Sequence, residues 1–425
     1  MIHFVRYTIL LSIFSSMNSW ALPPINLFRP SDPFLIPERD PCNPFQFTVG
    51  YEGALSIRGF QDDHEECDQI GTCTVEKDKE VNVLQIYQDK QNALAAFKGF
   101  DGSTRQGQLA QLFNIHDENG TQGLFVPKGC FRVPLNLMFA ARYHFSHGIS
   151  FGFFLPVYTM ELTDVRWKEK SNSKVFENRL QEDFTQLVSD LAQLKLRSWK
   201  RTGIGDFLSQ VSWTQNFPQA RPLLTNVQVQ LRFGVSVPTG EKQDEDKVLA
   251  LPFGNDGSWG LQFAGGLNLT FCHYLRGGID AEFLFLFGNT RNRRIRVDCH
   301  QTDLLFLTKD QAFREFGFSQ QYNIFLETCN FFRGTRLRLN YQYLKRNEDR
   351  LFICNDRIDS FIANDAESLQ DWTAHSFIVG VGYDFARDIP QSPFIPSLLG
   401  WFKWGFNGKR ALLANTLGVT LSVSF

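Results

Sequence analysis

Beyond its first residues, the sequence lacks any run of about 18 apolar residues, which excludes transmembrane helices. It also lacks an excess of one charge, with 43 Lys and Arg against 45 Asp and Glu, so we expect no nucleic-acid binding. No Cys-x-x-Cys pair and no Cys/His spacing of a zinc site occurs, and neither a metal nor another cofactor is expected. His-Glu-x-x-His and phosphate-loop motifs are missing, and we assign no oriented nucleophile to His144, so we predict that the chain is not an enzyme.

Aromatic residues, by contrast, are abundant. They make up 14% of the 425 residues, and 43 of them are Phe. This content is high for a surface that faces water, and it is natural for an outer face in contact with lipid. The mean hydropathy of −0.23 does not fit a helical membrane protein.

The first 21 residues have the features of a secretory signal peptide. Arg6 supplies the positive charge, an apolar stretch follows from Tyr7 to Phe14, and Ser19-Trp20-Ala21 is a small-residue cleavage site. We therefore expect export and cleavage near Ala21, with residues 22–44 forming a periplasmic segment. The alternative for this stretch is a membrane anchor, which its short apolar run disfavours.

Strict alternation of apolar and polar residues recurs along the rest of the chain and predicts an all-β protein. In residues 45–57, for example, Phe47, Val49 and Tyr51 alternate with Thr48, Gly50 and Glu52. The alternating segments are residues 45–57, 131–145, 149–159, 206–217, 227–237, 259–271, 279–287, 321–327, 336–343, 376–385 and 417–425, and residues 394–406 supply a twelfth.

Strand length and loop length favour a membrane-spanning barrel over a soluble sandwich. The segments are roughly ten residues or longer, as a tilted crossing of a bilayer requires. Short connections at 146–148, 218–224, 273–277 and 330–333 alternate with long ones at 60–130, 164–205, 239–257, 291–314 and 347–372. Short periplasmic turns and long external loops are the arrangement of outer-membrane barrels. We predict an antiparallel transmembrane β-barrel over residues 45–425 with about 12 strands, or 14 if residues 81–88 and 109–116 add a pair to it rather than lying in the first loop.

The polar face of each strand is expected to line the lumen. It carries arginines and carboxylates, and mixed charge of this kind can select ions or can simply hydrate and stiffen the wall. The lumen and selectivity candidates are Arg58, Arg132, Arg142, Arg232, Arg336, Arg338, Glu282 and Glu327. Across the 330–333 turn, pairing residue 329 with residue 334 would place Glu327 opposite Arg336.

One amphipathic helix is predicted, over residues 175–197. Its apolar residues recur every three or four positions: Phe176, Leu180, Phe184, Leu187, Leu191 and Leu194. The helix would lie in an external loop, either as a constriction or plug in the barrel mouth or as ordinary loop packing. Residues 60–130 form the long first loop and are the second candidate plug.

Cysteines and basic runs give further expectations. An even count of eight Cys in an exported chain suggests disulfides, with Cys67–Cys73 and Cys299–Cys354 as candidate pairs. Cys272 and Cys329 would be too far apart, because a strand separates them. Basic runs at 291–296 and 195–201 could hold lipopolysaccharide phosphates or gather anionic solutes, or could simply be solvated.

Two segments resemble known outer-membrane proteins. The last ten residues, Thr416-Leu-Gly-Val-Thr-Leu-Ser-Val-Ser-Phe425, are similar to the C-terminal strand that the outer-membrane assembly machinery reads. In addition, Gly203-Ile-Gly-Asp206, Val237-Pro-Thr-Gly240 and Leu251-Pro-Phe-Gly-Asn-Asp-Gly257 resemble the hairpin signature of porin-like transporters related to the phenol-degradation meta-pathway outer-membrane family. The resemblance implies an outer-membrane location, contact with lipid and lipopolysaccharide, and passage of small molecules.

The leading functional hypothesis is therefore a porin-like channel or facilitated-diffusion transporter for small solutes. The alternative is a structural or adhesive surface protein that uses the barrel as an anchor. A barrel enzyme is a third reading, which would need a Ser–His pair at the rim or on the lipid face.

Overall fold

The computed structural model describes residues 43–62, 64–67, 73–76, 80–112, 123–170, 184–272, 274–332, 334–385 and 394–425. The expected signal peptide, residues 1–21, and residues 22–42 of the N-terminal segment lie outside these ranges. Within them, no helix has the length and apolar character needed to cross a membrane.

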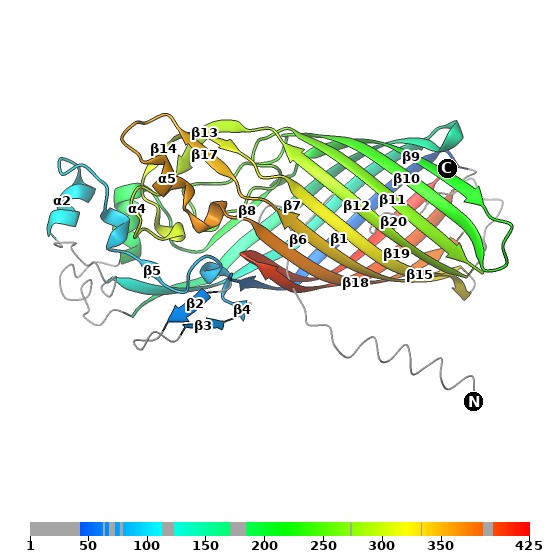
Figure 1. The fold of residues 1–425 in the computed structure, drawn as a ribbon, viewed down its shortest axis with the longest axis horizontal. Helices are drawn as coiled ribbons and strands as arrows, with labels where there is room; N and C mark the ends of the chain where they lie inside the picture. The colour runs from blue at the N-terminus through cyan, green and yellow to red at the C-terminus, as the bar shows by residue number, and fades with distance from the viewer. Residues whose placement is uncertain are drawn as a thin grey trace.

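Twelve antiparallel strands close into a barrel, as predicted (Figure 1). The first strand pairs with the last on one side and with β6 on the other, so no backbone edge is left open to lipid. The barrel strands are β1 (Phe45–Phe60), β6 (Leu124–His144), β7 (Ile149–Glu169), β9 (Phe207–Pro218), β10 (Leu224–Val237), β11 (Gly260–Phe271), β12 (Leu275–Leu286), β15 (Ser319–Phe332), β16 (Thr335–Arg346), β18 (Trp372–Asp384), β19 (Ile395–Lys409) and β20 (Ala411–Ser424).

The alternation in sequence becomes two faces of different polarity. On β1, Phe47 and Tyr51 are about two-fifths exposed on the outside, whereas Thr48 and Glu52 are almost fully buried on the inside. The same contrast repeats on the other strands, where large apolar side chains cover the outer surface. The barrel therefore has an apolar exterior for lipid and a polar interior.

The connections sort by length, also as predicted. Where β1 and β20 meet, Phe45 and Phe425 exchange backbone hydrogen bonds of 3.0 and 2.8 Å, and the tight turns between strands lie at this same end. The long connections lie at the other end (Figure 1). One connection at that end departs from this rule, because Arg410 alone joins β19 to β20.

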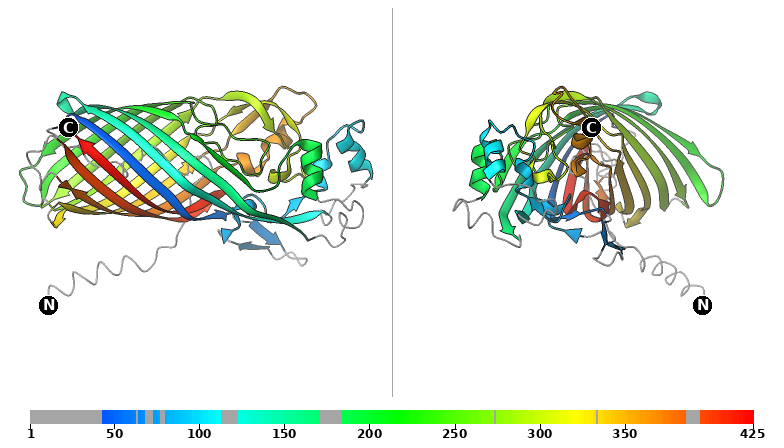
Figure 2. Two further views of the ribbon diagram at one scale, coloured as in Figure 1. Left: turned by 180° about the vertical axis from the view of Figure 1, so that it is seen from behind. Right: turned by 60° about the vertical axis from the view of Figure 1, so that its left-hand side comes forward.

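The long connections carry short elements of their own, which cluster over one end of the barrel (Figure 2). Within these connections β13, β14 and β17 form a three-stranded sheet and β2 pairs with β3, while β4, β5 and β8 pair with the barrel strands β1, β6 and β7. These elements are β2 (His64–Cys67), β3 (Cys73–Glu76), β4 (Glu80–Val81), β5 (Gln91–Asn92), α2 (Arg105–Leu112), α4 (Phe184–Ala192), β8 (Trp199–Ile204), β13 (Asn289–Arg294), β14 (Lys309–Glu315), β17 (Arg350–Ile353) and α5 (Ser360–Asn364). Residues 81–88 and 109–116 add no barrel strand, because the described parts of both lie within the first loop.

An apolar core fills the loop end of the barrel. It joins buried loop residues such as Phe97, Leu196 and Leu305 to inward-facing strand residues such as Leu344 and Ala414. These side chains are packed together and nearly inaccessible. The first loop contributes to this core through residues such as Leu84, Leu94 and Phe97, and its role as a plug stays a prediction.

The expected amphipathic helix ends at Ala192 instead of at residue 197. Its described part is α4, and Phe176 and Leu180 lie outside the described residues. The helix ends at Ala192 because Gln193 adopts a left-handed conformation with φ of 56°, which a right-handed helix cannot continue. Leu194, expected on the helix, is buried beyond its end instead.

The two candidate disulfides have different outcomes. The backbone register places Cys67 opposite Cys73 across the β2–β3 pair, and the disulfide between them stays a prediction. Cys299 and Cys354, by contrast, are free and exposed, so the structure does not contain the bridge expected between them. β12 lies between β11, which Cys272 directly follows, and β15, which contains Cys329.

Candidate functional site

The lumen contains a cavity of about 600 Å³ near the short-turn end. Its wall is built almost entirely from polar side chains on the inner faces of the strands. They include Arg142, His144, Ser150, Gln210, Gln228, Gln230, Arg232, Asn268, Arg276, Asp280, Asn323, Glu327, Arg336, Arg338 and Asn340. Arg142, Arg232, Arg336, Arg338 and Glu327 had been predicted as lumen residues, and the structure brings these five together.

Arg142 has no ion-pair partner in the described part of the chain. Its guanidinium carbon lies 5.5 Å from the centre of the Phe154 ring, and the side chain lines the cavity. Its cross-strand neighbour on β1, Gln46, is 1% exposed, and neither side-chain amide atom of Gln46 finds a hydrogen-bond partner. A cation without a counter-charge and a buried amide without a partner make this wall a candidate contact for a solute.

Arg232, in contrast, is held by carboxylates. Its guanidinium donates to both oxygens of Asp280, at 2.9 and 2.8 Å, and lies 3.8 Å from Glu282. The three side chains come from β10 and β12, and all are at least nine-tenths buried. This group carries no excess of positive charge.

Glu327 sits between two arginines. Arg276 donates to it at 2.9 Å and Arg338 lies 3.5 Å from it, while the Arg338 guanidinium stacks 3.8 Å from the Phe325 ring centre. The expected Glu327–Arg336 pair is wrong by two positions, because β15 runs on to Phe332 and the register sets Glu327 opposite Arg338. Arg336 pairs with Asp384 at 3.4 Å instead.

The cavity wall is therefore positively biased. Five arginines line it, against the two carboxylates of Asp280 and Glu327. Glu282 and Asp384 also form ion pairs with arginines of this wall, whereas Arg142 has no ion-pair partner among the described residues. A small anion would meet a favourable potential along this wall.

Two predicted lumen arginines lie on the outer face. In β1 the pairing register shifts between Ala54 and Ser56, so Arg58 turns outward and pairs with Glu80 at 2.5 Å. In β6 a similar shift follows Arg132, which is exposed and pairs across the sheet with Glu161. A one-residue bulge moves every later side chain to the other face, which explains both corrections.

The three motifs of the transporter-like signature converge on one buried carboxylate. Asp206 accepts hydrogen bonds from the backbone N–H of Gly240 at 2.9 Å and of Asn255 at 2.5 Å. A Cβ on Gly254 would lie only 2.3 Å from this carboxyl group, so glycine is required there. Burial raises the pKa of Asp206, and the two N–H donors oppose that rise. The signature thus anchors the 238–259 loop to the wall.

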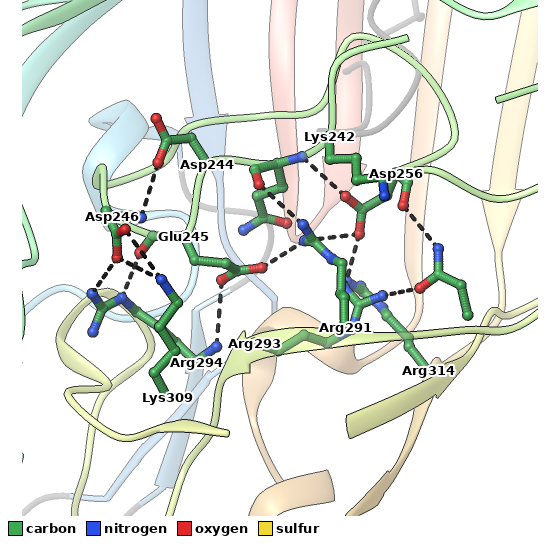
Figure 3. A network of polar contacts seen from close by, with 12 residues as sticks. Lys242, Asp244, Glu245, Asp246, Asp256, Arg291, Arg293, Arg294, Lys309 and Arg314 are labelled. Carbon is green, nitrogen blue, oxygen red and sulfur yellow. Dashed lines mark hydrogen bonds and ion pairs between the residues drawn. The ribbon is translucent and has the colours of Figure 1, made fainter. Parts of the chain in front are cut away.

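The basic run at 291–296 is not a free external patch. Arg291, Arg293 and Arg294 are held by carboxylates of the 238–259 loop (Figure 3). Arg296 is held by Asp365 of the 347–371 loop. Arg291 contacts Glu245 at 2.6 Å and Asp256 at 3.0 Å, and Arg294 contacts Asp246 at 3.0 Å. In the second run, Arg201 pairs with Glu241 at 3.1 Å. These arginines therefore tie loops together.

Helix α4 packs within the loop layer. The Phe184 ring stacks on Phe125 with centres 4.4 Å apart and meets the edge of Trp167 at 6.0 Å. Leu187 is buried in the same apolar core, and Leu191 packs against it. No described residue of the helix lines the lumen cavity, and its geometry fits the loop-packing alternative.

Sequence reasoning missed two features of the cavity. Arg276 begins the polar face of β12 directly after a turn, and extending that face four residues from Asp280 toward the turn would have included it. Gly148-Ile149-Ser150-Phe151-Gly152 also has the Gly-x-Ser-x-Gly spacing, and Ser150 lies directly across from His144. The motif lies at the start of a strand rather than in a strand-to-helix turn. The Ser150 hydroxyl forms a hydrogen bond of 2.6 Å with the Ser212 hydroxyl. The arrangement gives no activated nucleophile.

Known structures share this architecture. No family model and no curated protein matches the chain in sequence. An outer-membrane channel from Pseudomonas putida F1 superposes with a TM-score of 0.50 at 11% identity, covering 94% of this chain and 100% of that one. The Ralstonia pickettii toluene transporter TbuX gives a TM-score of 0.32 at 9% identity, covering 90% and 89%. The first comparison shows that this chain has the fold of an outer-membrane channel.

Proposed function

We propose that this protein is a porin-like channel of the bacterial outer membrane that lets small polar solutes cross by facilitated diffusion. The observation that carries the proposal is the polar cavity inside a closed barrel with an apolar exterior. A barrel that served only as an anchor would need no lumen cavity of about 600 Å³ lined by charged side chains. The excess of arginine over carboxylate on that wall favours anionic solutes.

Export and insertion complete the proposal. The N-terminal signal peptide directs the chain out of the cytoplasm and is cleaved near Ala21. The assembly machinery then recognises the C-terminal strand that ends at Phe425 and inserts the barrel into the outer membrane, where it contacts lipid and lipopolysaccharide.

The loop core gives the channel a closed resting state. Its buried apolar side chains stand in the path of a polar solute at the loop end, so passage requires part of this layer to move. We infer a channel of low conductance that opens briefly rather than a wide permanent pore.

Single-channel recording in planar bilayers tests the proposal. Purified, folded protein should show discrete conductance steps, and reversal potentials in a salt gradient should indicate preference for the anion. A preparation that shifts on a heat-modifiability gel, and is therefore folded, yet stays silent at every voltage would support the anchor alternative.

A further inference from the structure

A second cavity, of about 150 Å³, lies at the loop end of the barrel. It is lined by the 238–259, 287–318 and 347–371 connections and by the loop-side ends of neighbouring strands such as β16 and β18. Three arginines that line it converge on one aromatic ring. The guanidinium carbons of Arg293, Arg314 and Arg346 lie 5.9, 5.3 and 5.3 Å from the ring centre of Phe316.

These arginines are deeply buried. Arg293 and Arg346 are 3% and 2% exposed, and Phe316 is 5% exposed. The Nε of Arg293 has no hydrogen-bond partner in the described part of the chain. Burying a cation costs free energy unless carboxylates or hydrogen-bond acceptors satisfy it, so such a cluster needs an explanation.

The carboxylates nearby do not balance the cluster. Asp256 forms ion pairs with both Arg291 and Arg293, at 3.0 and 2.8 Å. Asp349 forms ion pairs with both Arg314 and Arg346, at 2.5 and 2.7 Å. Arg291 also pairs with Glu245 at 2.6 Å, so around the ring four guanidinium groups share three carboxylates. The cluster therefore has one positive charge more than these carboxylates balance.

The crowding of cations has a measurable consequence. Burial, followed by repulsion from Arg314, lowers the pKa of Arg293 to about 10. At neutral pH the group is still charged, so the excess remains and the cavity attracts an anion. Carboxylate and phosphate oxygens match the forked donors of a guanidinium.

We propose that this loop-end cavity is a binding site for a small oxyanion, a carboxylate or a phosphate, held by Arg293, Arg314 and Arg346. The inference rests on the proposed function in one respect, since the cavity would be the first binding site for an anionic solute that enters from the loop end. The site itself is distinct from the lumen cavity, and the two share no lining residue.

Isothermal titration calorimetry on the folded full-length chain in detergent tests the site, with inorganic phosphate and acetate as two separate probes at constant ionic strength. At least one probe should bind, and its identity distinguishes phosphate from carboxylate. Arg293→Gln should weaken binding about tenfold, because one charged donor group is lost. Arg350→Gln is the matched control, since Arg350 is exposed and pairs with Glu348 on the surface.

Two further variants keep the result decisive. Arg293→Lys retains the charge but loses the forked geometry, and it should bind more weakly than the parent even if Arg293→Gln fails to fold. Arg142→Gln removes the unpaired cation of the lumen cavity, so it should affect only a separate binding step contributed by the lumen and leave in place the step that is weakened in Arg293→Gln. Absence of binding by both probes, or equal weakening by Arg142→Gln and Arg293→Gln, would overturn the inference. A silent channel that still binds phosphate would refute only the proposed function.

Discussion

At the scale of single residues, the charge of the lumen is concentrated in a few arginines, and Arg142 has no counter-charge among the residues that the structure describes. We expect Arg142→Gln to reduce the preference of the channel for anions. A unit charge about 4 Å from an ion contributes about 1 to 4 kcal/mol between bulk water and a protein surface, which corresponds to a change of roughly fivefold or more in the permeability ratio. Reversal potentials in a salt gradient measure this ratio.

The exposed Arg350 provides the control for that experiment. Arg350→Gln removes the same charge outside the lumen cavity and should leave the ratio unchanged. Equal effects from the two variants would mean that the lumen wall does not set selectivity.

A second residue-scale prediction concerns Asp349, which joins Arg314 and Arg346 and accepts the Gly317 N–H at 2.7 Å. Asp349→Asn would leave two buried arginines without their shared carboxylate, which should destabilise the 347–371 loop by about 3 to 5 kcal/mol. Limited proteolysis should then cut this loop faster. Glu348→Gln, one residue earlier and exposed, should have little effect.

The same residue predicts a pH dependence. Burial alone would raise the pKa of Asp349, but Arg314 and Arg346 outweigh burial and hold it below its usual value. A carboxyl with a lowered pKa stabilises the fold above its unfolded pKa, and this contribution is lost as the pH falls through the folded pKa. Protection of the loop in hydrogen exchange should therefore decline below about pH 4 in the parent. In Asp349→Asn this acid-dependent step should be absent.

Residue-scale prediction from sequence worked where the strands are regular. Arg142, Arg232, Arg336 and Arg338 reach the lumen because alternation holds without interruption to their positions. Arg58 and Arg132 lie beyond bulges, and no local pattern marks where a strand gains an extra residue. Which arginines contact Glu327 likewise depends on the pairing register. The expected turn set that register two residues away from its position in the structure, and so predicted Arg336 in place of Arg338.

At the scale of elements, the turn between β6 and β7 is the tightest test of local backbone geometry. Gly148 has a φ of 79°, and a Cβ there would lie 2.0 Å from the Thr214 carbonyl oxygen. We expect Gly148→Ala to cost about 1 to 2 kcal/mol from the backbone alone, with more from the contact. The unfolding midpoint in urea should fall accordingly.

Gly400 gives the matched comparison. It lies in β19, and the nearest atom to an added Cβ is 3.9 Å away. Gly400→Ala should leave the midpoint close to that of the parent. A similar loss in both variants would indicate that glycine content, and not the turn, controls stability.

Elements with strong periodicity were predictable, and short loop elements were not. All twelve strands were found because each alternates over many residues. The helix was overextended because the apolar spacing continues through Leu194, whereas the chain leaves the helix at Gln193. The β13–β14–β17 sheet was not anticipated, since its strands are four to seven residues long and its register depends on contacts between distant loops.

At the scale of the whole molecule, the barrel and the loop core are two structures with separate roles. Phe97 is fully buried in the loop core. Phe97→Ala should weaken this core by about 3 to 5 kcal/mol while the barrel stays closed, because its strands hold each other by hydrogen bonds. We expect more frequent or larger conductance steps in planar bilayers and an unchanged heat-modifiability gel.

Phe361→Ala serves as the comparison, because Phe361 is 81% exposed at the start of α5. Its truncation should leave the conductance as it is. If Phe97→Ala also left the conductance unchanged, the loop core would not be the barrier to passage.

The seam between β1 and β20 has a consequence for how the chain is built. It joins the segments that are farthest apart in the sequence, and the hydroxyls of Thr48 and Ser422 meet across it. Contacts between such distant residues form late, because the whole intervening polypeptide must be ordered first. Until β20 pairs with it, the edge of β1 presents unpaired backbone N–H and C=O groups, which readily pair with a strand from another chain. Rapid capture of that last segment is therefore the step at which productive insertion and aggregation compete.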